Sequence, residues 1–160
     1  MRTNQKGFTL IEILIVVAII AILASVVLVG LGPTQQKGRD ARRLSDLREI
    51  QNGLELYYNA NGSYPDGNST QEPVSTMYSN NASQFTSAGI SQAFPGDPTG
   101  SGNFQYEYYS NGTSYAIGDC LEGTNPPAYQ PPTSGVGQTL FTSLSAKCQG
   151  GASSTYVLTL

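Results

Sequence analysis

The 160-residue sequence contains no histidine and no tryptophan, and charged residues make up only 12% of it. Without histidine the chain has no Ser-His-Asp triad, no histidine general base and no histidine metal ligand. It also has no Gly-x-Ser-x-Gly turn and no phosphate-cradling loop, so we do not expect an enzyme. The formal net charge is −3, which argues against nucleic acid as a partner.

Apolar residues are concentrated in one long run near the amino terminus. Between Ile13 and Leu31 the only residues that are not aliphatic are Ser25 and Gly30, and none is charged. At about 1.5 Å per residue, a helix of this length measures roughly 28 Å, close to the roughly 30 Å hydrocarbon core of a membrane. The rest of the chain is too polar to surround a helix that is apolar on every face. The run therefore predicts one membrane-spanning helix.

Charge and cysteine are also unevenly distributed. Seven of the eight basic residues lie at or before Arg48, and only Lys147 follows it. The distal part is acidic and rich in small polar residues, which suits a surface outside the cell. Its two cysteines, Cys120 and Cys148, fit an oxidising compartment in which a pair can form a disulfide. A count of the bases that flank the span would instead place this part in the cytoplasm.

Glu12 is a carboxylate within the apolar region, where such residues usually have a function. The string Gln5-Lys6-Gly7-Phe8-Thr9-Leu10-Ile11-Glu12-Ile13 resembles the processing site of type IV pilins and of type II secretion pseudopilins. The resemblance implies that a prepilin peptidase cuts after Gly7, removes the leader 1–7 and methylates the new amino terminus at Phe8. It also implies that Glu12 is the assembly residue. A cleavable secretory signal fits less well, because its apolar stretch would be shorter.

The resemblance suggests how the subunits assemble. Cleavage after Gly7 converts the uncharged amide of Phe8 into an ammonium group. Opposite charges attract strongly in a low-dielectric setting, so Glu12 of one subunit is expected to pair with this ammonium on a neighbour. We therefore expect a structural subunit without a cofactor, which polymerises through its helix into a type IV pilus or a pseudopilus. The alternative is a membrane-tethered binding module that does not polymerise.

The expected partners follow from this interpretation. They are copies of the chain or related subunits, the prepilin peptidase, the assembly machinery of the inner membrane, and lipid before assembly. The leader motif and the cysteine pair favour a single pass through the cytoplasmic membrane with the C-terminal domain outside, then an envelope-spanning or cell-surface filament. The basic cluster Lys37–Arg48 is expected to contact lipid headgroups and to form local salt bridges rather than to bind nucleic acid.

A long helix is predicted over residues 8–62, of which 8–32 form the membrane-spanning and polymerising half. At Gly30, Gly32 and Pro33 the first helix either ends at the membrane interface or has a hinge, as the resemblance implies. Beyond this point one apolar stripe recurs at intervals of three or four residues and ends near Gly62. The stripe consists of Leu44, Leu47, Ile50, Leu54 and Tyr57. Off it lie Arg39, Arg42 and Arg43, which can pair locally with Asp46 and Glu49.

Residues 63–160 predict a globular β-rich domain with long loops. Alternating aromatic residues indicate a strand over 104–109, and Asn111-Gly112 predicts a hairpin turn into a second strand over 114–118. A third strand is expected over 155–160. The aromatic residues expected on one face of the first strand are Phe104, Tyr106 and Tyr108. An antiparallel sheet packed on the helical stripe gives an α+β fold, in agreement with the pilin fold that the resemblance implies.

The resemblance extends to Cys120 and Cys148, which match the disulfide-bounded carboxyl-terminal region of type IVa pilins. The stretch between them is rich in proline and is expected to need this clamp more than a core. The resemblance to major pseudopilins also raises a calcium site in this region, with Asp97, Asp119 and Glu122 as candidate ligands. Because scattered acidic residues are usually solvated, no metal site is expected.

Overall fold

The computed structural model describes residues 7–65, 70–100, 103–126, 129–148 and 154–159, and of residues 28–31 it describes the backbone alone. The chain divides into two compact units, residues 1–35 and residues 36–160. The elements in chain order are α1 (Leu10–Asn61), β1 (Glu72–Pro73), α2 (Val74–Asn80), α3 (Ala82–Ser87), β2 (Glu107–Ser110), β3 (Tyr115–Leu121), α4 (Gly135–Cys148) and β4 (Ser154–Thr159).

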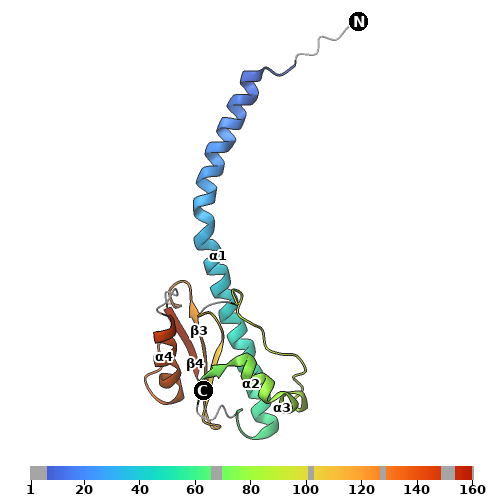
Figure 1. Ribbon diagram of the computed structural model, residues 1–160, viewed down its shortest axis with the longest axis vertical. Coiled ribbons are helices and arrows are strands. Elements are labelled where there is room, and N and C mark those ends of the chain that lie inside the picture. The colour runs from blue at the N-terminus through green and yellow to red at the C-terminus, as the bar shows by residue number, and fades with distance from the viewer. Residues whose placement is uncertain (1–6, 66–69, 101–102, 127–128, 149–153, 160) are drawn as a thin grey trace. The chain divides into compact units, whose positions relative to one another are not determined.

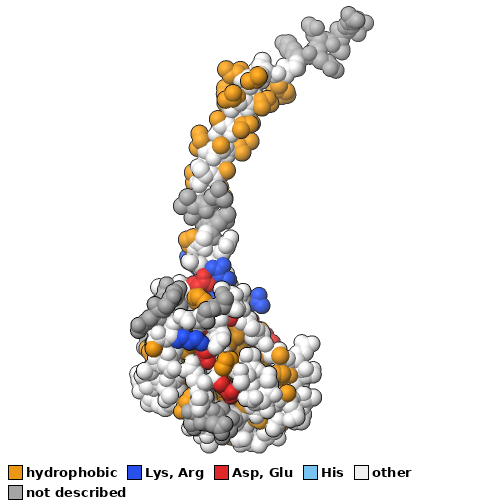
Figure 2. All heavy atoms as spheres, viewed as in Figure 1, with side chains coloured by type: hydrophobic (Ala, Val, Ile, Leu, Met, Phe, Trp, Pro, Cys, Tyr) orange, Lys and Arg blue, Asp and Glu red, His pale blue; other side chains and the backbone are white. Residues whose placement is uncertain are grey.

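The described part of the first unit is mainly the apolar start of helix α1. Over Leu10–Val27 the mean hydropathy is 3.1, and none of these residues is buried in the structure. Figure 2 shows apolar side chains along this stretch. Among the described residues it is the one helix that is long and apolar enough to cross a membrane, judged by length and composition. This agrees with the predicted span.

Helix α1 continues through Pro33. It begins at Leu10, contains Pro33 and ends at Asn61, so the alternative of a helix terminus next to Pro33 is wrong. A proline removes one hydrogen bond from a helix and can bend it, but the residues on either side can continue the helix. The hinge at Gly30, Gly32 and Pro33 stays a prediction.

The second half of α1 follows the predicted pattern closely. Its stripe is buried at Leu47, Ile50, Leu54 and Tyr57, whereas Leu44 is only half-buried. The helix ends where expected, because Gly62 has a φ of 75° and its N–H donates to the carbonyl of Tyr58 at 2.8 Å. This left-handed conformation is accessible to glycine without strain and is a common helix terminator.

The sheet is antiparallel throughout, with the order β1-β2-β3-β4 (Figure 1). The predicted hairpin is confirmed: β2 and β3 are joined by the loop 111–114, which contains Asn111-Gly112, and the φ of Gly112 is 83°. The predicted third strand is confirmed as β4, which pairs with β3, although Leu160 lies outside the described residues. The two-residue strand β1 was not predicted.

Strand β3 is buried along its whole length because helices cover both of its faces. Tyr115 and Ile117 belong to the core formed with α1, whereas Ala116 and Cys120 belong to a second core formed with α4. The expectation that the stretch after β3 needs a clamp more than a core is therefore wrong, because helix α4 buries Leu140 and Leu144 against the sheet. Apart from Asp119, the residues on both faces of β3 are apolar or small, so each face requires a covering layer.

The aromatic alternation holds only for part of the predicted first strand. Tyr106 and Tyr108 are buried in the core with α1, but Phe104 packs against the second core. Strand β2 begins only at Glu107, so the two-residue period of a strand does not extend back to Phe104. The prediction that all three rings share one face is therefore wrong for Phe104.

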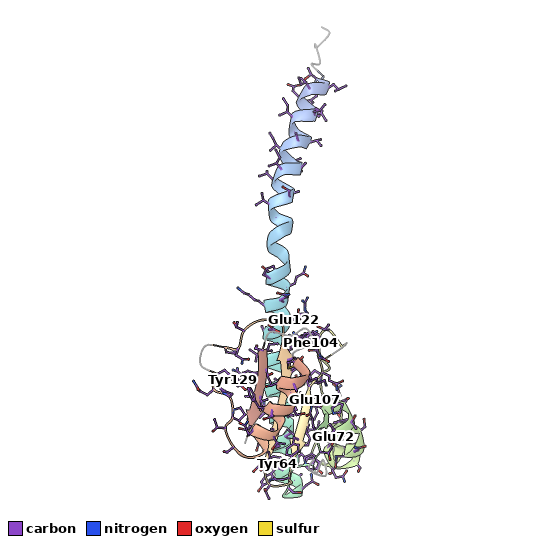
Figure 3. The ribbon with its side chains drawn as sticks, turned by 60° about the vertical axis from the view of Figure 1, so that its left-hand side comes forward. Tyr64, Glu72, Phe104, Glu107, Glu122 and Tyr129 are labelled. Carbon is purple, nitrogen blue, oxygen red and sulfur yellow. A yellow bond between two sulfur atoms is a disulfide. The ribbon has the colours of Figure 1, made fainter. Side chains whose placement is uncertain are left out.

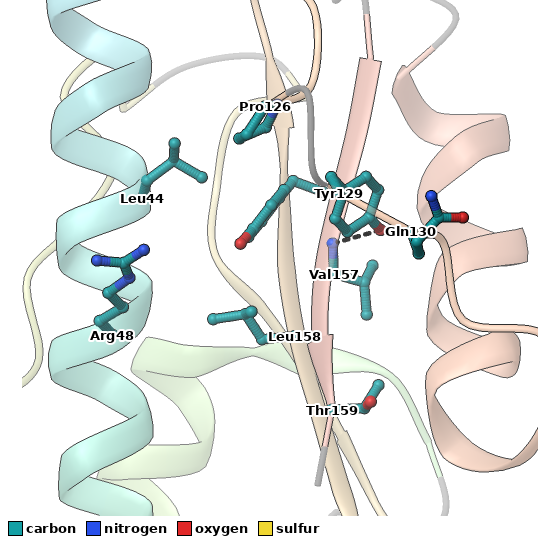
Figure 4. Close-up of a pocket in the computed structure, with 9 residues that line it drawn as sticks. Leu44, Arg48, Pro126, Tyr129, Gln130, Val157, Leu158 and Thr159 are labelled. Carbon is teal, nitrogen blue, oxygen red and sulfur yellow. Dashed lines mark hydrogen bonds between the residues drawn. The ribbon is translucent and has the colours of Figure 1, made fainter.

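Strand β4 is one of the two edges of the sheet, and two side chains cover part of its backbone. The Val157 N–H donates to the hydroxyl of Tyr129 at 3.0 Å, and the Asn125 side-chain amide donates to the carbonyl of Thr155 at 3.0 Å. Tyr129 also lines a cleft of about 400 Å³ between β4 and helix α1, as Figure 4 shows. The loop after β3 therefore occupies hydrogen-bonding groups that an edge strand would otherwise expose.

Candidate functional site

The predicted cleavage point lies in a short exposed segment before helix α1. Gly7, Phe8 and Thr9 have no regular secondary structure, and the Phe8 side chain is 86% exposed. No heavy atom lies within 4 Å of a Cβ built on Gly7. The bond between Gly7 and Phe8 is therefore accessible in this chain, whereas the preceding leader residues 1–6 lie outside the described residues.

Glu12 caps the amino terminus of helix α1. Its Oε2 accepts hydrogen bonds from the backbone N–H and the hydroxyl of Thr9, both at 2.7 Å. The Glu12 N–H in turn donates to the Thr9 hydroxyl at 3.3 Å. This reciprocal arrangement is a capping box, which satisfies N–H groups that the first turn of a helix leaves without partners. The Thr-x-x-Glu pattern is visible in the sequence, but sequence reasoning assigned Glu12 only to assembly and missed its partner Thr9.

The surface that follows Glu12 is apolar on all sides. The side chains of Ile13, Ile20 and Val26 are each more than half exposed, and Glu12 is the one charged residue in Leu10–Val27. A continuous apolar surface of this size is characteristic of contact with lipid or with other apolar helices.

The two cysteines of the globular unit form the disulfide that the resemblance implied. Cys120 on β3 is bonded to Cys148 at the end of α4, and both residues are buried in the second core. The bond fastens α4 to the face of the sheet opposite α1.

A buried ion cluster joins α1 to the rest of the globular unit. Arg43 is fully buried and forms ion pairs with Asp40 at 2.8 Å, Asp97 at 2.5 Å and Glu122 at 2.9 Å. Its guanidinium carbon lies 4.6 Å from the ring centroid of Phe104, and Figure 3 shows Phe104 and Glu122 beside α1. Charge and ring therefore enclose the guanidinium on several sides.

This cluster corrects the prediction for the basic residues of α1. Arg42 pairs locally with Asp46 at 3.5 Å as expected. Arg43, however, is buried rather than exposed to lipid headgroups, and Arg39 pairs with Glu122 at 2.5 Å, far along the chain. No ion pair of Glu49 is found among the described residues. The spacing carried a signal, because Arg43 precedes Leu47 by four residues and thus extends the buried stripe.

The pKa values of the acidic residues in the cluster are shifted in opposite directions by their surroundings. Hydrogen bonding from Arg39 lowers the pKa of Glu122 to about 2. Burial would raise the pKa of Asp97, but hydrogen bonds from Arg43 and from the 99–100 backbone lower it below its ordinary value. Burial, together with the nearby charge of Asp97, raises the pKa of Asp119 to about 8. At neutral pH Asp119 is therefore mostly protonated while Asp97 and Glu122 are ionised.

Two parts of the chain match families of known proteins. Residues 2–28 match the family described as the prokaryotic N-terminal methylation motif. Residues 31–122 match the family described as type II secretion system protein G. No solved structure matches the chain.

Individual relatives point to the same family. The chain is 32% identical to type II secretion system core protein G of Vibrio cholerae over 115 residues, 71% of this chain and 77% of that protein. It is also 32% identical to core protein G of Escherichia coli K12 over 99 residues, 61% of this chain and 68% of that protein. The major component of the type IV wide pilus of Thermus thermophilus is 44% identical over 61 residues, 38% of this chain and 47% of that protein.

The methylation motif covers the exposed Gly7–Phe8 junction and the apolar part of α1. The larger match covers the rest of α1 and the sheet as far as the end of β3. The chain is a pilin-like structural subunit and belongs to the type II secretion system protein G family.

Proposed function

We propose that the chain is made as a precursor, cut after Gly7 by a prepilin peptidase, methylated at Phe8, and polymerised through its apolar helix. The filament contains copies of the chain itself or of related subunits. The observation that carries this proposal is the placement of an exposed Gly7–Phe8 junction directly before an apolar helix whose one charged residue is Glu12. The match of residues 2–28 to the methylation motif supports the same processing step.

The capping box suggests the order in which Glu12 changes its partners during assembly. Before cleavage, the Thr9 donors hold Oε2 of Glu12, and Oε1 accepts no hydrogen bond from the residues that the structure describes. Cleavage creates an ammonium group on Phe8 that has no counterpart in the precursor. In a filament, the Glu12 carboxylate of one copy then neutralises the Phe8 ammonium of the next, which removes two uncompensated charges from an apolar setting.

The same proposal includes the location of the chain before and after assembly. Before assembly the Leu10–Val27 helix anchors it in the cytoplasmic membrane, in contact with lipid, with the disulfide-bonded domain on the outer side. Assembly moves the apolar surface from lipid into a bundle of like helices, where close packing replaces lipid contacts. The peptidase and an inner-membrane assembly machinery are the partners of these steps, and the product is a filament in the cell envelope or on its surface.

The test compares Glu12→Gln with Ser25→Ala in cells that contain the peptidase and the assembly machinery. Glutamine keeps an oxygen that accepts from Thr9 but carries no charge, whereas Ser25 donates only to the carbonyl of Ile22 within the same helix. We expect the Glu12→Gln chain to be inserted and processed but to form no filaments in the sheared fraction, and Ser25→Ala to behave as the wild type.

Intact mass measurement of the mature protein tests the processing step separately. Loss of residues 1–7 together with the gain of one methyl group on Phe8 is expected. A mature chain that keeps its leader would refute the proposal. Filaments formed equally well by Glu12→Gln would show that the charge is not needed and would favour a different assembly contact.

A further inference from the structure

The ion cluster around Arg43 is built from segments that are far apart in the sequence. Asp40 belongs to α1 and lies three residues from Arg43, whereas Asp97, Asp119 and Glu122 lie 54, 76 and 79 residues beyond it. Three of these residues, Asp97, Asp119 and Glu122, are the carboxylates that the sequence offered as calcium ligands. The structure brings them together, but it places a guanidinium among them.

The oxygens of Asp40 and Glu122 are already occupied by nitrogen donors. Oδ1 of Asp40 accepts from Arg43 at 2.8 Å and from the Glu122 N–H at 3.0 Å, and Oδ2 accepts from the Gly123 N–H at 2.8 Å. Both oxygens of Glu122 accept from Arg39, at 2.7 and 2.5 Å, and Oε1 also accepts from Arg43 at 2.9 Å. A metal ion bound to these carboxylates would therefore compete with nitrogen donors at every one of their oxygens.

Asp97 is held in the same way. Its Oδ2 accepts from Nε of Arg43 at 2.5 Å, and its Oδ1 accepts from the backbone N–H groups of Thr99 at 2.7 Å and Gly100 at 3.0 Å. Nη2 of Arg43 donates to the Thr99 hydroxyl at 2.8 Å. Nη2 also donates to Oδ1 of Asp97 at 3.3 Å, so Arg43 and the backbone of this loop engage both oxygens of the carboxylate and hold the loop against α1.

Only one carboxylate oxygen of the cluster accepts no hydrogen bond from the described residues, and one oxygen cannot form a metal site by itself. Oδ1 of Asp119 accepts from the Cys120 N–H at 2.7 Å, while the buried Oδ2 accepts no hydrogen bond from the described residues and lies 3.7 Å from Nε of Arg43. Calcium takes six to eight oxygen ligands. Across the described part of the chain, no group of three or more acidic or cysteine side chains is arranged to hold a metal ion.

We propose that the Arg43 guanidinium is the built-in cation of this cluster and takes the place of a bound divalent metal ion. A planar guanidinium with five N–H donors can bridge several carboxylates at once, which an ammonium group cannot do in the same geometry. The junction of α1 with the 97–100 loop and the end of β3 therefore closes without metal. This proposal does not depend on polymerisation, so it is tested on the subunit alone.

The first experiment measures thermal unfolding of the full chain in detergent, followed by circular dichroism, in excess chelator and in excess calcium. The two melting temperatures are expected to agree within about 1 °C, whereas a site filled at a hundredfold its Kd would separate them by roughly 5 °C or more. A fall of several degrees in chelator would overturn the proposal, because it would show that a metal ion stabilises the fold.

The second experiment compares Arg43→Gln with Arg42→Gln, both in chelator. The neighbouring Arg42 side chain is 61% exposed and has a single ion pair, with Asp46, so it controls for loss of one positive charge. We expect Arg43→Gln to lower the melting temperature by roughly 10 °C or more, or to abolish cooperative unfolding, because it leaves several buried acids without their cation. Equal melting temperatures for the two variants would contradict the proposal, and the chelator comparison remains decisive if Arg43→Gln does not fold.

Discussion

Replacing Gly118 by alanine tests the two-sided packing of strand β3. A Cβ on Gly118 would lie 2.5 Å from the backbone carbonyl oxygen of Tyr156, 2.8 Å from Cγ2 of Val157 and 2.9 Å from Cδ1 of Leu144. The carbonyl oxygen belongs to the neighbouring strand β4, and Leu144 belongs to helix α4. The new methyl group can therefore be accommodated only if the strand, the helix or both move away.

The expected magnitude is a balance of two opposing effects. Overpacking a close-packed interior destabilises by typically about 1–3 kcal/mol, whereas replacing glycine restricts the unfolded chain and stabilises by about 0.4–1 kcal/mol. The steric effect dominates at Gly118, because backbone of the adjacent strand obstructs the new atom. We expect a net loss of about 2 kcal/mol, which lowers the melting temperature by roughly 6–10 °C for a unit of this size.

The matched control is Gly38→Ala. Gly38 lies on the exposed side of α1, and no heavy atom lies within 4 Å of a Cβ built there. Alanine is favoured over glycine in a helix by up to about 1 kcal/mol, so this variant is expected to be more stable than the wild type. Urea titration of the full chain in detergent measures both changes. A Gly118→Ala midpoint at or above that of the wild type would refute the packing of α4 against β3 described above.

Two further variants examine the disulfide and the buried acid. Replacing both Cys120 and Cys148 by alanine is expected to lower the free energy of unfolding by about 3–4 kcal/mol, because the enclosed loop no longer restricts the unfolded chain; an unchanged urea midpoint would contradict this. The raised pKa of Asp119, about 8 in the folded chain, means that the folded state binds more protons than the unfolded state between roughly pH 4 and that value. This residue therefore makes the wild type less stable as the pH rises over that range, and Asp119→Asn is expected to remove that decline. Parallel slopes for the two proteins in urea titrations at several pH values would show that the carboxyl does not titrate as described.

Features set by local sequence were predictable. The stripe Leu47–Tyr57 follows the helical period, and Asn111-Gly112 specifies a tight turn whose conformation depends on these two residues. The methylation motif, which a family match over residues 2–28 supports, could be recognised because its residues are contiguous. In each case the physical cause lies within a few residues of the feature itself.

Features set by distant residues were not predicted. In α4, Val136, Leu140, Leu144 and Cys148 recur every four residues, a helical spacing, but nearby glycine and hydroxyl residues weaken the local helical preference. The helix is stabilised by burial against the second face of the sheet. Likewise, no local pattern shows that Arg43 meets carboxylates more than 50 residues away.

The side chains that cover strand β4 affect how copies of this protein can meet. Open sheet edges are templates on which a second molecule can add a strand, and such growth leads to aggregation. In this chain the Val157 amide and the Thr155 carbonyl are already engaged by Tyr129 and Asn125, so an incoming strand finds two of its hydrogen-bonding positions taken. Strand addition at β4, and the amyloid-like growth that would follow from it, is therefore disfavoured when copies of this chain lie close together.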